Sequence, residues 1–187
     1  MADGGSDRVT EKRRRILAAA RHLMLRQGLR GTTMELIARE AGIAKPTLYA
    51  QFADKDAVLT GIIGELLVEL EAAFTAGLAG PGSVAERVGA ALAGKYTVIA
   101  RLLAGSPHAD ELMNEHHRVA ERFRDFDEAV ERRIADALAE AGAEDPQGLA
   151  RLAIAASYGI GYKLTNEREI GEAIRVLCRR VIGPAVG

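Results

Sequence analysis

The stretch TTMELIAREAGIAKPTLYAQF, residues 32–52, decides the fold. It opens with Thr32 and Glu35, a T-x-x-E pattern typical of the capping box, in which two side chains satisfy free backbone amides at a helix start. The apolar residues that follow have helical spacing, and Gly42 is placed to end this first helix. A second helix, barely two turns long, is predicted over residues 45–51, with a lysine and a proline at its start.

Two short helices joined by a glycine turn, with a helix before them, are typical of a helix-turn-helix unit. In such a unit the last helix enters the major groove of DNA, and its first turns reach the base edges. A buried core has no use for a lysine, a proline and a tyrosine on so short a helix. The stretch therefore predicts a DNA-reading helix over residues 45–51.

The composition of the whole chain indicates an all-α protein. Of its 187 residues 48% are hydrophobic, enough to bury a sizeable core, and only 4% are aromatic. Strand-like alternation of β-branched residues is missing, while apolar rows recur at helical spacing. We expect about nine helices, including a short one over residues 108–117.

The apolar rows and the breaks between them divide the chain into three parts. Residues 1–9 are polar and glycine-rich, which predicts a flexible tail. Residues 10–56 form the helix-turn-helix domain, with the motif itself at residues 33–52. Residues 57–187 form a larger helical domain.

Charge is distributed unevenly along the chain. Residues 1–60 carry 11 Lys and Arg against 7 Asp and Glu, whereas the remaining residues carry 14 against 19. A basic head on an acidic body favours contact between the head and a polyanion such as DNA. A charged surface without any partner explains the same counts.

Nothing in the sequence indicates a metal site, a cofactor, a membrane span or a catalytic group. Cys178 lies in an apolar row and is expected to be a small core residue in a reducing, cytoplasmic compartment. No cysteine is left to build a zinc site, and the adjacent His116 and His117 would point to different sides of a helix. No apolar run approaches the ~18 residues of a membrane helix. No nucleophile–base set, carboxylate pair or phosphate loop stands out.

At this point a resemblance becomes specific. The stretch of residues 32–59 resembles part of the DNA-binding domain of the TetR family of bacterial transcriptional repressors. The whole resemblance to that domain extends over about residues 10–60. The features that carry this resemblance are the Thr pair, Ile37-Ala38, Ala41-Gly42-Ile43, Leu48-Tyr49, Phe52 and Lys55. The rest of the chain resembles the family in the number and length of its helices.

The resemblance and the side-chain chemistry together nominate eight DNA-contacting residues. The resemblance implies that Tyr49 and Lys55 contact phosphates, and Thr33 at a helix start suits a third phosphate. Lys45 suits guanine O6 and N7, and the other side chains suit base edges or thymine methyls. Core packing remains an alternative for Tyr49, as does the absence of any base contact for two others, Ala50 and Gln51. The full set is Thr33, Lys45, Pro46, Thr47, Tyr49, Ala50, Gln51 and Lys55.

Two features beside the motif leave alternatives open. Ala44 stands where many relatives have a capping serine, and such a cap contributes ~1 kcal/mol in other helices. The run Arg13-Arg14-Arg15 is either an arm for the minor groove or the charged solvent face of the first helix, and we favour the helix face.

For the larger domain the resemblance implies an effector pocket and a dimer interface. Each pocket candidate is more typical of a plain core residue than of a ligand contact, and the apolar face over residues 147–164 is also compatible with burial inside one subunit. The pocket candidates are Phe74, Tyr96, Leu103, Met113, His117, Phe123, Phe126, Ser157, Tyr158 and Tyr162. The interface candidates are Ala155, Ala156, Gly159, Gly161, Ile174, Leu177 and Val181.

The sequence thus predicts a ligand-responsive transcriptional regulator, most readily a repressor, that binds a palindromic DNA operator as a homodimer. A small hydrophobic effector would release it by favouring a spacing of the two reading helices that no longer fits DNA. No cofactor, metal or membrane partner is expected. Two alternatives are an all-helical protein-interaction adaptor and an uncharacterised helical enzyme.

Overall fold

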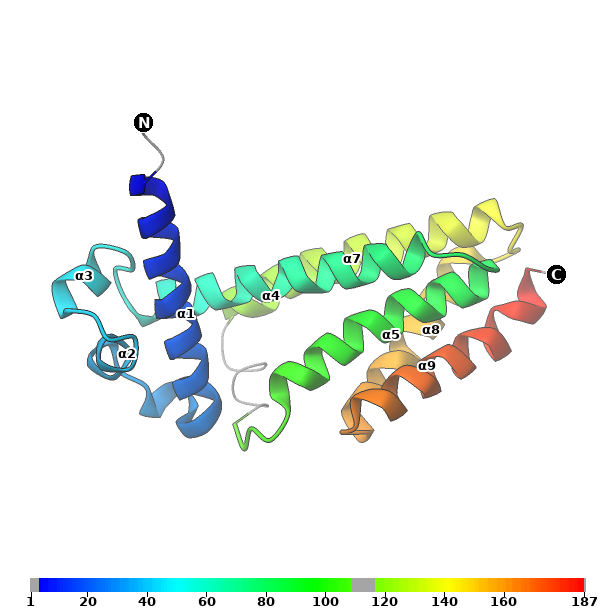
Figure 1. Ribbon diagram of the computed structural model, residues 1–187. Coiled ribbons are helices and arrows are strands. Elements are labelled where there is room, and N and C mark those ends of the chain that lie inside the picture. Colours follow the sequence, from blue (N-terminus) through cyan, green and yellow to red (C-terminus); the bar gives the residue numbers. More distant parts are fainter. Residues whose placement is uncertain (1–3, 109–116, 187) are drawn as a thin grey trace. The chain divides into compact units, whose positions relative to one another are not determined.

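The computed structural model describes residues 4–108 and 117–186, and these ranges are helical throughout apart from connecting turns (Figure 1). The all-α prediction is confirmed. The short helix predicted over residues 108–117 falls almost entirely outside the described residues. The described α-helices are α1 (Gly4–Gly31), α2 (Met34–Glu40), α3 (Lys45–Tyr49), α4 (Lys55–Leu78), α5 (Val84–Leu103), α7 (His117–Glu140), α8 (Pro146–Lys163) and α9 (Glu167–Val181), followed by the 3₁₀ turn η1 (Gly183–Ala185).

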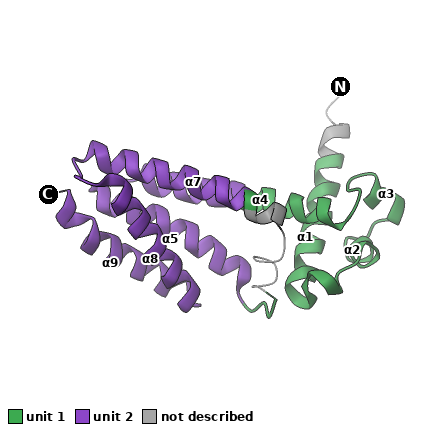
Figure 2. Cartoon of the chain, turned by 180° about the vertical axis from the view of Figure 1, so that it is seen from behind, with its two compact units in different colours: residues 1–66, 105–121 green, residues 67–104, 122–187 purple. Residues whose placement is uncertain are grey.

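The chain divides into two compact units (Figure 2). Unit 1 comprises Met1–Leu66 and Gly105–Glu121, and unit 2 comprises Leu67–Ala104 and Arg122–Gly187. The boundary after Leu66 lies inside α4, ten residues beyond the predicted one at 56. Both α4 and α7 contribute residues to both units, because each helix continues across a unit boundary.

The first helix is longer than predicted. It begins at Gly4, so residues 4–9 of the predicted flexible tail are helical. Each residue added to an existing helix gains a backbone hydrogen bond without the cost of a new nucleus. Gly28 adopts a left-handed φ of 77° and kinks the chain before one final turn. That conformation is accessible to glycine at little cost.

Unit 1 is held together by an apolar core that joins α1, α2, α3 and the first half of α4. Ile16, Ile37, Leu48 and Val58 are each fully buried and come from these four helices in turn. Gly61 on α4 allows close packing here, since a Cβ on it would lie 2.8 Å from Cδ2 of Leu17. The core therefore fixes the orientation of the short α3.

Unit 2 has a larger core, shared by α5, α7, α8, α9 and the end of α4. Helix α5 lies side by side with α9 (Figure 1), and a Cβ added to Gly89 would lie 3.2 Å from Cβ of Cys178. Ser83 and Glu86 form a complete capping box at the start of α5. Cys178 is buried, as predicted, and burial raises the pKa of its thiol to about 11.

Candidate nucleic-acid interface

The N-terminal cap of α2 is Thr33, so the prediction that Thr32 and Glu35 form a capping box is wrong. Thr32 is fully buried and its hydroxyl donates to the Gly28 carbonyl at 2.8 Å, closing the last turn of α1. Thr33 has the extended backbone of a cap, and its hydroxyl accepts from the Leu36 amide at 3.2 Å. Either member of a threonine pair is able to cap a helix, and the tertiary position of the first decides which one does.

The turn between α2 and α3 is a Schellman motif. Gly42 has a φ of 63°, and its amide donates to the Arg39 carbonyl at 3.1 Å. The Ile43 amide donates to the Ala38 carbonyl at 3.0 Å, which completes the pattern. Gly42 is thus the residue that ends the helix, as predicted, and the turn sets the direction in which α3 leaves.

Helix α3 ends at Tyr49 and continues as a turn over residues 50–51, so it is two residues shorter than predicted. Ala44 occupies the cap position without a side-chain hydrogen bond, and Pro46 lies in the first turn. Leu48 and Phe52 are buried on one side and anchor the helix to unit 1.

The opposite side of α3 is accessible. Lys45 and Pro46 are exposed, Thr47 and Gln51 are partly so, and Ala50 is exposed. Tyr49 is 48% exposed, which excludes the alternative that it is a core residue. These are the residues nominated for base and phosphate contact, and the structure gathers them on one short, anchored surface together with Thr33 at the nearby start of α2.

Lys45 already has an anionic neighbour within the protein. Its Nζ lies 3.2 Å from Oε1 of Glu35 on α2, and both side chains are more than half exposed. The pKa of Glu35 is lowered, first by its own backbone amide and then by the Lys45 ammonium. Because the pair is in water, Lys45 exchanges Glu35 for another acceptor at small cost.

Lys55 has a role that the sequence did not indicate. Its ammonium donates to the carbonyls of Leu29 at 2.7 Å and Thr32 at 3.0 Å, and so it holds the segment between α1 and α2. Two of its three protons are committed inside unit 1. Contact between Lys55 and a phosphate, implied by the resemblance, stays a prediction. The third ammonium proton of Lys55 is the one that would donate to the phosphate.

The arginine run lies within α1, so its interpretation as a free arm for the minor groove is wrong. Arg13 stacks on Phe52, with its guanidinium carbon 4.4 Å from the ring centroid. Arg14 pairs with Glu11 at 2.7 Å, and Arg15 donates to the Ala41 carbonyl at the end of α2 at 2.6 Å. A cation at a helix C-terminus is favourable, because the carbonyl ends carry partial negative charge.

Comparison with known proteins agrees with this geometry. Residues 16–62 match the family described as bacterial regulatory proteins, tetR family. The chain is similar to TetR-family regulators, most specifically over this N-terminal segment. TetR-family proteins are DNA-binding transcriptional regulators and not enzymes. The matched segment holds α2, α3 and the turn between them, so it includes the surface described above.

Solved TetR-family structures share the fold of both units. A regulator of the TetR/AcrR family from Thermobifida fusca is 26% identical with a TM-score of 0.68, covering 90% of this chain and 96% of that one. GusR from Salmonella enterica is 25% identical with a TM-score of 0.67, covering 92% and 96%. A TetR-like regulator from Rhodococcus sp. RHA1, 18% identical, has a TM-score of 0.71 over 92% and 96% and shows the fold alone. No curated protein matches the chain significantly.

In unit 2 the structure separates the predicted pocket residues into groups. Phe74, Tyr96 and Ser157 are buried, while Leu103, Phe123 and Phe126 are partly buried. Met113 and the side chain of His117 lie outside the described residues.

Tyr158 and Tyr162 are wrong as pocket residues, because they are 63% and 66% exposed on α8 and stack on each other at 6.4 Å between ring centroids. They lie on the side of α8 opposite the buried stripe of Ala150, Ala153 and Ser157. A sequence row alone does not tell which of two apolar faces is the inner one.

Lys95 on α5 is the residue that sequence reasoning missed. It is buried, and its Nζ contacts Oδ1 of Asp127 on α7 at 2.5 Å. The rings of Tyr96 and Phe126 lie 5.2 and 5.4 Å from the same nitrogen. Burial, and then the Asp127 carboxylate, raise the pKa of Tyr96. The signal was a lone lysine within an otherwise apolar row over residues 88–96.

The predicted dimer-interface residues also divide by exposure. Ala155 and Gly159 are exposed on α8, and Ala156, Leu177 and Val181 are partly exposed. Ile174 is wrong as an interface residue, because it is fully buried in the core of unit 2. Gly161 is wrong as well: it faces α5, where a Cβ would lie 2.9 Å from Cδ1 of Tyr96.

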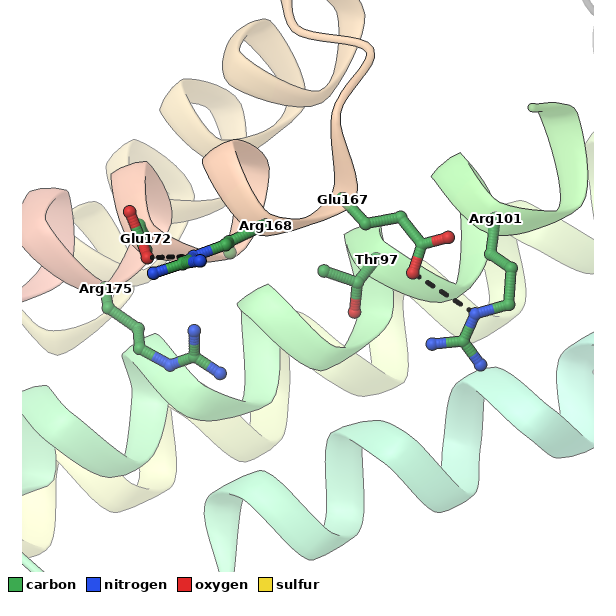
Figure 3. Close-up of a pocket in the computed structure, with 7 residues that line it drawn as sticks. Thr97, Arg101, Glu167, Arg168, Glu172 and Arg175 are labelled. Atoms are coloured by element: carbon green, nitrogen blue, oxygen red, sulfur yellow. Dashed lines mark hydrogen bonds and ion pairs between the residues drawn. The ribbon is translucent and has the colours of Figure 1, made fainter. Parts of the chain in front are cut away.

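A hollow of about 340 Å³ lies between α5 and α9, and most of its lining residues are charged, unlike the aromatic and apolar residues predicted for the effector pocket (Figure 3). Arg101 pairs with Glu167 at 3.2 Å and Arg168 with Glu172 at 2.9 Å on its walls. None of the predicted pocket residues lines it. In the described part of the chain, no helix combines the length and hydropathy needed to span a membrane.

Proposed function

We propose that this chain is a TetR-family repressor that binds a palindromic operator as a dimer through α3 and is released by a small-molecule effector. The observation that carries the proposal is the two-sided α3. Leu48 and Phe52 are buried and hold it, while Lys45 at its start is exposed and Thr47, two residues later, is partly exposed. A short helix fixed from behind, with donors on its free side, suits the reading of base edges.

A second copy of this chain is the occupant that we propose for the exposed face of α8. Leu152 and the stacked Tyr158 and Tyr162 are more than half exposed there, and the exposed Ala155 and Gly159 between them permit close approach of another helix. TetR-family regulators act as dimers. Two-fold symmetry through this face places two α3 helices on two half-sites, which requires a palindrome with centres about 34–36 Å apart.

Release by an effector follows from a shift between two conformations. Helices α4 and α7 each run through both units, so a change in the packing of unit 2 is transmitted along two continuous helices. The effector must bind the released form more tightly than the DNA-bound form, since equal affinity moves no population.

The test of operator binding is a gel shift and footprint on DNA upstream of the gene itself. We expect a protected region with two symmetric half-sites, and Lys45→Ala should lower affinity by about 5- to 100-fold for the matching base pair. The Val68→Ala variant, changed at an exposed residue of unit 2 outside the proposed dimer face, serves as a control that should bind normally. Equal affinity for operator and random DNA at physiological salt would refute the proposal.

The test of the dimer compares two exposed apolar residues of unit 2. Leu152→Glu, on the proposed face of α8, should yield monomers in light scattering and lose cooperative operator binding. Val68→Glu, on α4 and 70% exposed, should remain a dimer. A wild-type monomer, or a Leu152→Glu dimer, would contradict the assignment of this face.

A further inference from the structure

Among the described residues, the core of unit 2 contains a buried charge, Lys95, to which the proposed function gives no role. The side chain of Lys95 is only 5% exposed and is surrounded by buried apolar residues of α5 such as Leu92 and Tyr96. Lysine is almost never fully buried unless it is paired, because the loss of hydration of the ammonium is costly. A lysine buried this deeply is therefore expected to have an anionic partner.

The partner of Lys95 is held in a different environment. The Asp127 side chain is 50% exposed, although its Oδ1 contacts the buried Nζ. Water is able to solvate Asp127 if the pair separates, whereas Lys95 would be left without a counter-ion. Loss of the carboxylate is therefore tolerable only when another anion takes its place next to Nζ.

The surroundings of Lys95 suit an apolar molecule that carries such an anion. The Phe126 and Tyr96 rings flank the ammonium, and Gly161 on α8 leaves room for the Tyr96 ring. Ser157, one turn before Gly161 on the same side of α8, is fully buried. Its hydroxyl has no hydrogen-bond partner among the described residues, which is unusual for a buried polar group and supplies a donor for a ligand.

We propose that the effector is an amphiphilic anion, with an apolar body and one acidic group, and that this acidic group replaces Asp127 as the counter-ion of Lys95. This inference rests on the proposed release by an effector and names the chemical class of the ligand. The exchange frees Asp127, and with it α7, from α5. Because α7 contributes residues to both units, the same exchange supplies the change in packing that release requires.

The competing explanation is that Lys95 and Asp127 only stabilise the fold. A buried ion pair is often replaced by apolar side chains of similar volume without loss of stability. In that case removal of the Lys95 charge would have the same effect on the affinity for anions as on the affinity for neutral molecules. The two explanations therefore differ in selectivity and not in stability.

The experiment uses a pair of fluorescent probes with the same aromatic body: 8-anilinonaphthalene-1-sulfonate, which is anionic, and N-phenyl-1-naphthylamine, which is neutral. Lys95→Met should lower the affinity for the sulfonate probe at least about 10-fold, as expected for a lost charged hydrogen bond. Its affinity for the neutral probe should stay within about 2-fold of the wild-type value. Lys95→Arg should retain the preference for the anion. Lys163→Met, which removes an exposed lysine of α8, should change neither affinity.

Asp127→Asn provides a test that does not depend on the folding of a core variant, because Asp127 is half exposed. It should tighten binding of the sulfonate probe, since the competing carboxylate is gone. Three results would each overturn the proposal. One is unchanged or weaker binding of the sulfonate probe by Asp127→Asn, and another is an equal loss of affinity for both probes in a folded Lys95→Met variant. The third is a wild-type protein that binds neither probe. These measurements contain no DNA, so their failure leaves operator binding and dimer formation to be judged by their own tests.

Discussion

Substitution of Gly42 by alanine tests the turn that aims the DNA-reading helix. Gly42 has a φ of 63°, and this left-handed conformation costs a residue with a Cβ about 1–2 kcal/mol. A Cβ at this position would also lie 3.2 Å from Nη2 of Arg15, which donates to the Ala41 carbonyl. The arginine end is flexible, so we expect the conformational cost to dominate and the free energy of unfolding to fall by about 1–2 kcal/mol.

Three matched substitutions separate the contributions to this cost. Gly142 has a similar φ of 85°, and a Cβ added to it would have nothing within 4 Å. The Gly142→Ala variant therefore measures the conformational cost alone, in unit 2. Gly64→Ala, within α4 and equally open, should stabilise the protein by about 0.5–1 kcal/mol because alanine favours a helix. Gly42→Asn should recover part of the loss, since asparagine is the best-tolerated alternative at this position.

The assays are urea unfolding followed by circular dichroism and operator affinity by gel shift. Gly42→Ala and Gly142→Ala should lose similar stability, and only Gly42→Ala should also weaken operator binding, because only its turn positions α3. Unchanged stability in Gly42→Ala would refute the assigned backbone conformation. Unchanged operator affinity, despite lost stability, would refute the claim that this turn sets the direction of α3.

Three further outcomes follow from particular contacts. Tyr49→Phe, which removes an exposed hydroxyl, should weaken operator and random DNA alike by about 3- to 10-fold in gel shifts, as for one lost hydrogen bond; a loss confined to the operator would contradict a phosphate role. Cys178, whose pKa is raised to about 11 by burial, should resist Ellman's reagent at pH 8 until urea is added; rapid reaction in the native protein would show that it is accessible. Gly77→Ala should lower the free energy of unfolding by about 1–3 kcal/mol through overpacking, because its Cβ would meet the backbone of Ala90 and Ala91; stability equal to that of the wild type would be the contrary result.

The helices and the DNA-reading segment were predictable because local rules determine them. The positive φ of Gly42 and the first-turn position of Pro46 follow from what glycine and proline allow in any chain. Sequence therefore located the short helix and the turn before it.

Other assignments failed where tertiary packing makes the choice. The helix over 147–164 has two apolar sides, and only its packing against α5 and α9 decides that Ser157 lies inside and Tyr158 outside. Ile174 lies in an apolar row with the spacing expected of an interface face, but it is buried in the core of unit 2. Periodicity predicts that a face is apolar, while the identity of the surface that covers it depends on neighbours distant in sequence.

Counting charges fails for a related reason, because a cation contributes differently according to what it touches. Arg15 and Lys55 are part of the basic excess of the first sixty residues, yet they donate to carbonyls of Ala41, and of Leu29 and Thr32, inside unit 1. Their charges still add to the positive field that attracts DNA, although their hydrogen bonds organise the protein. The cations near α3 therefore combine two effects: they hold the helix-turn-helix motif in place, and they draw the polyanion towards the side chains that remain free to read it.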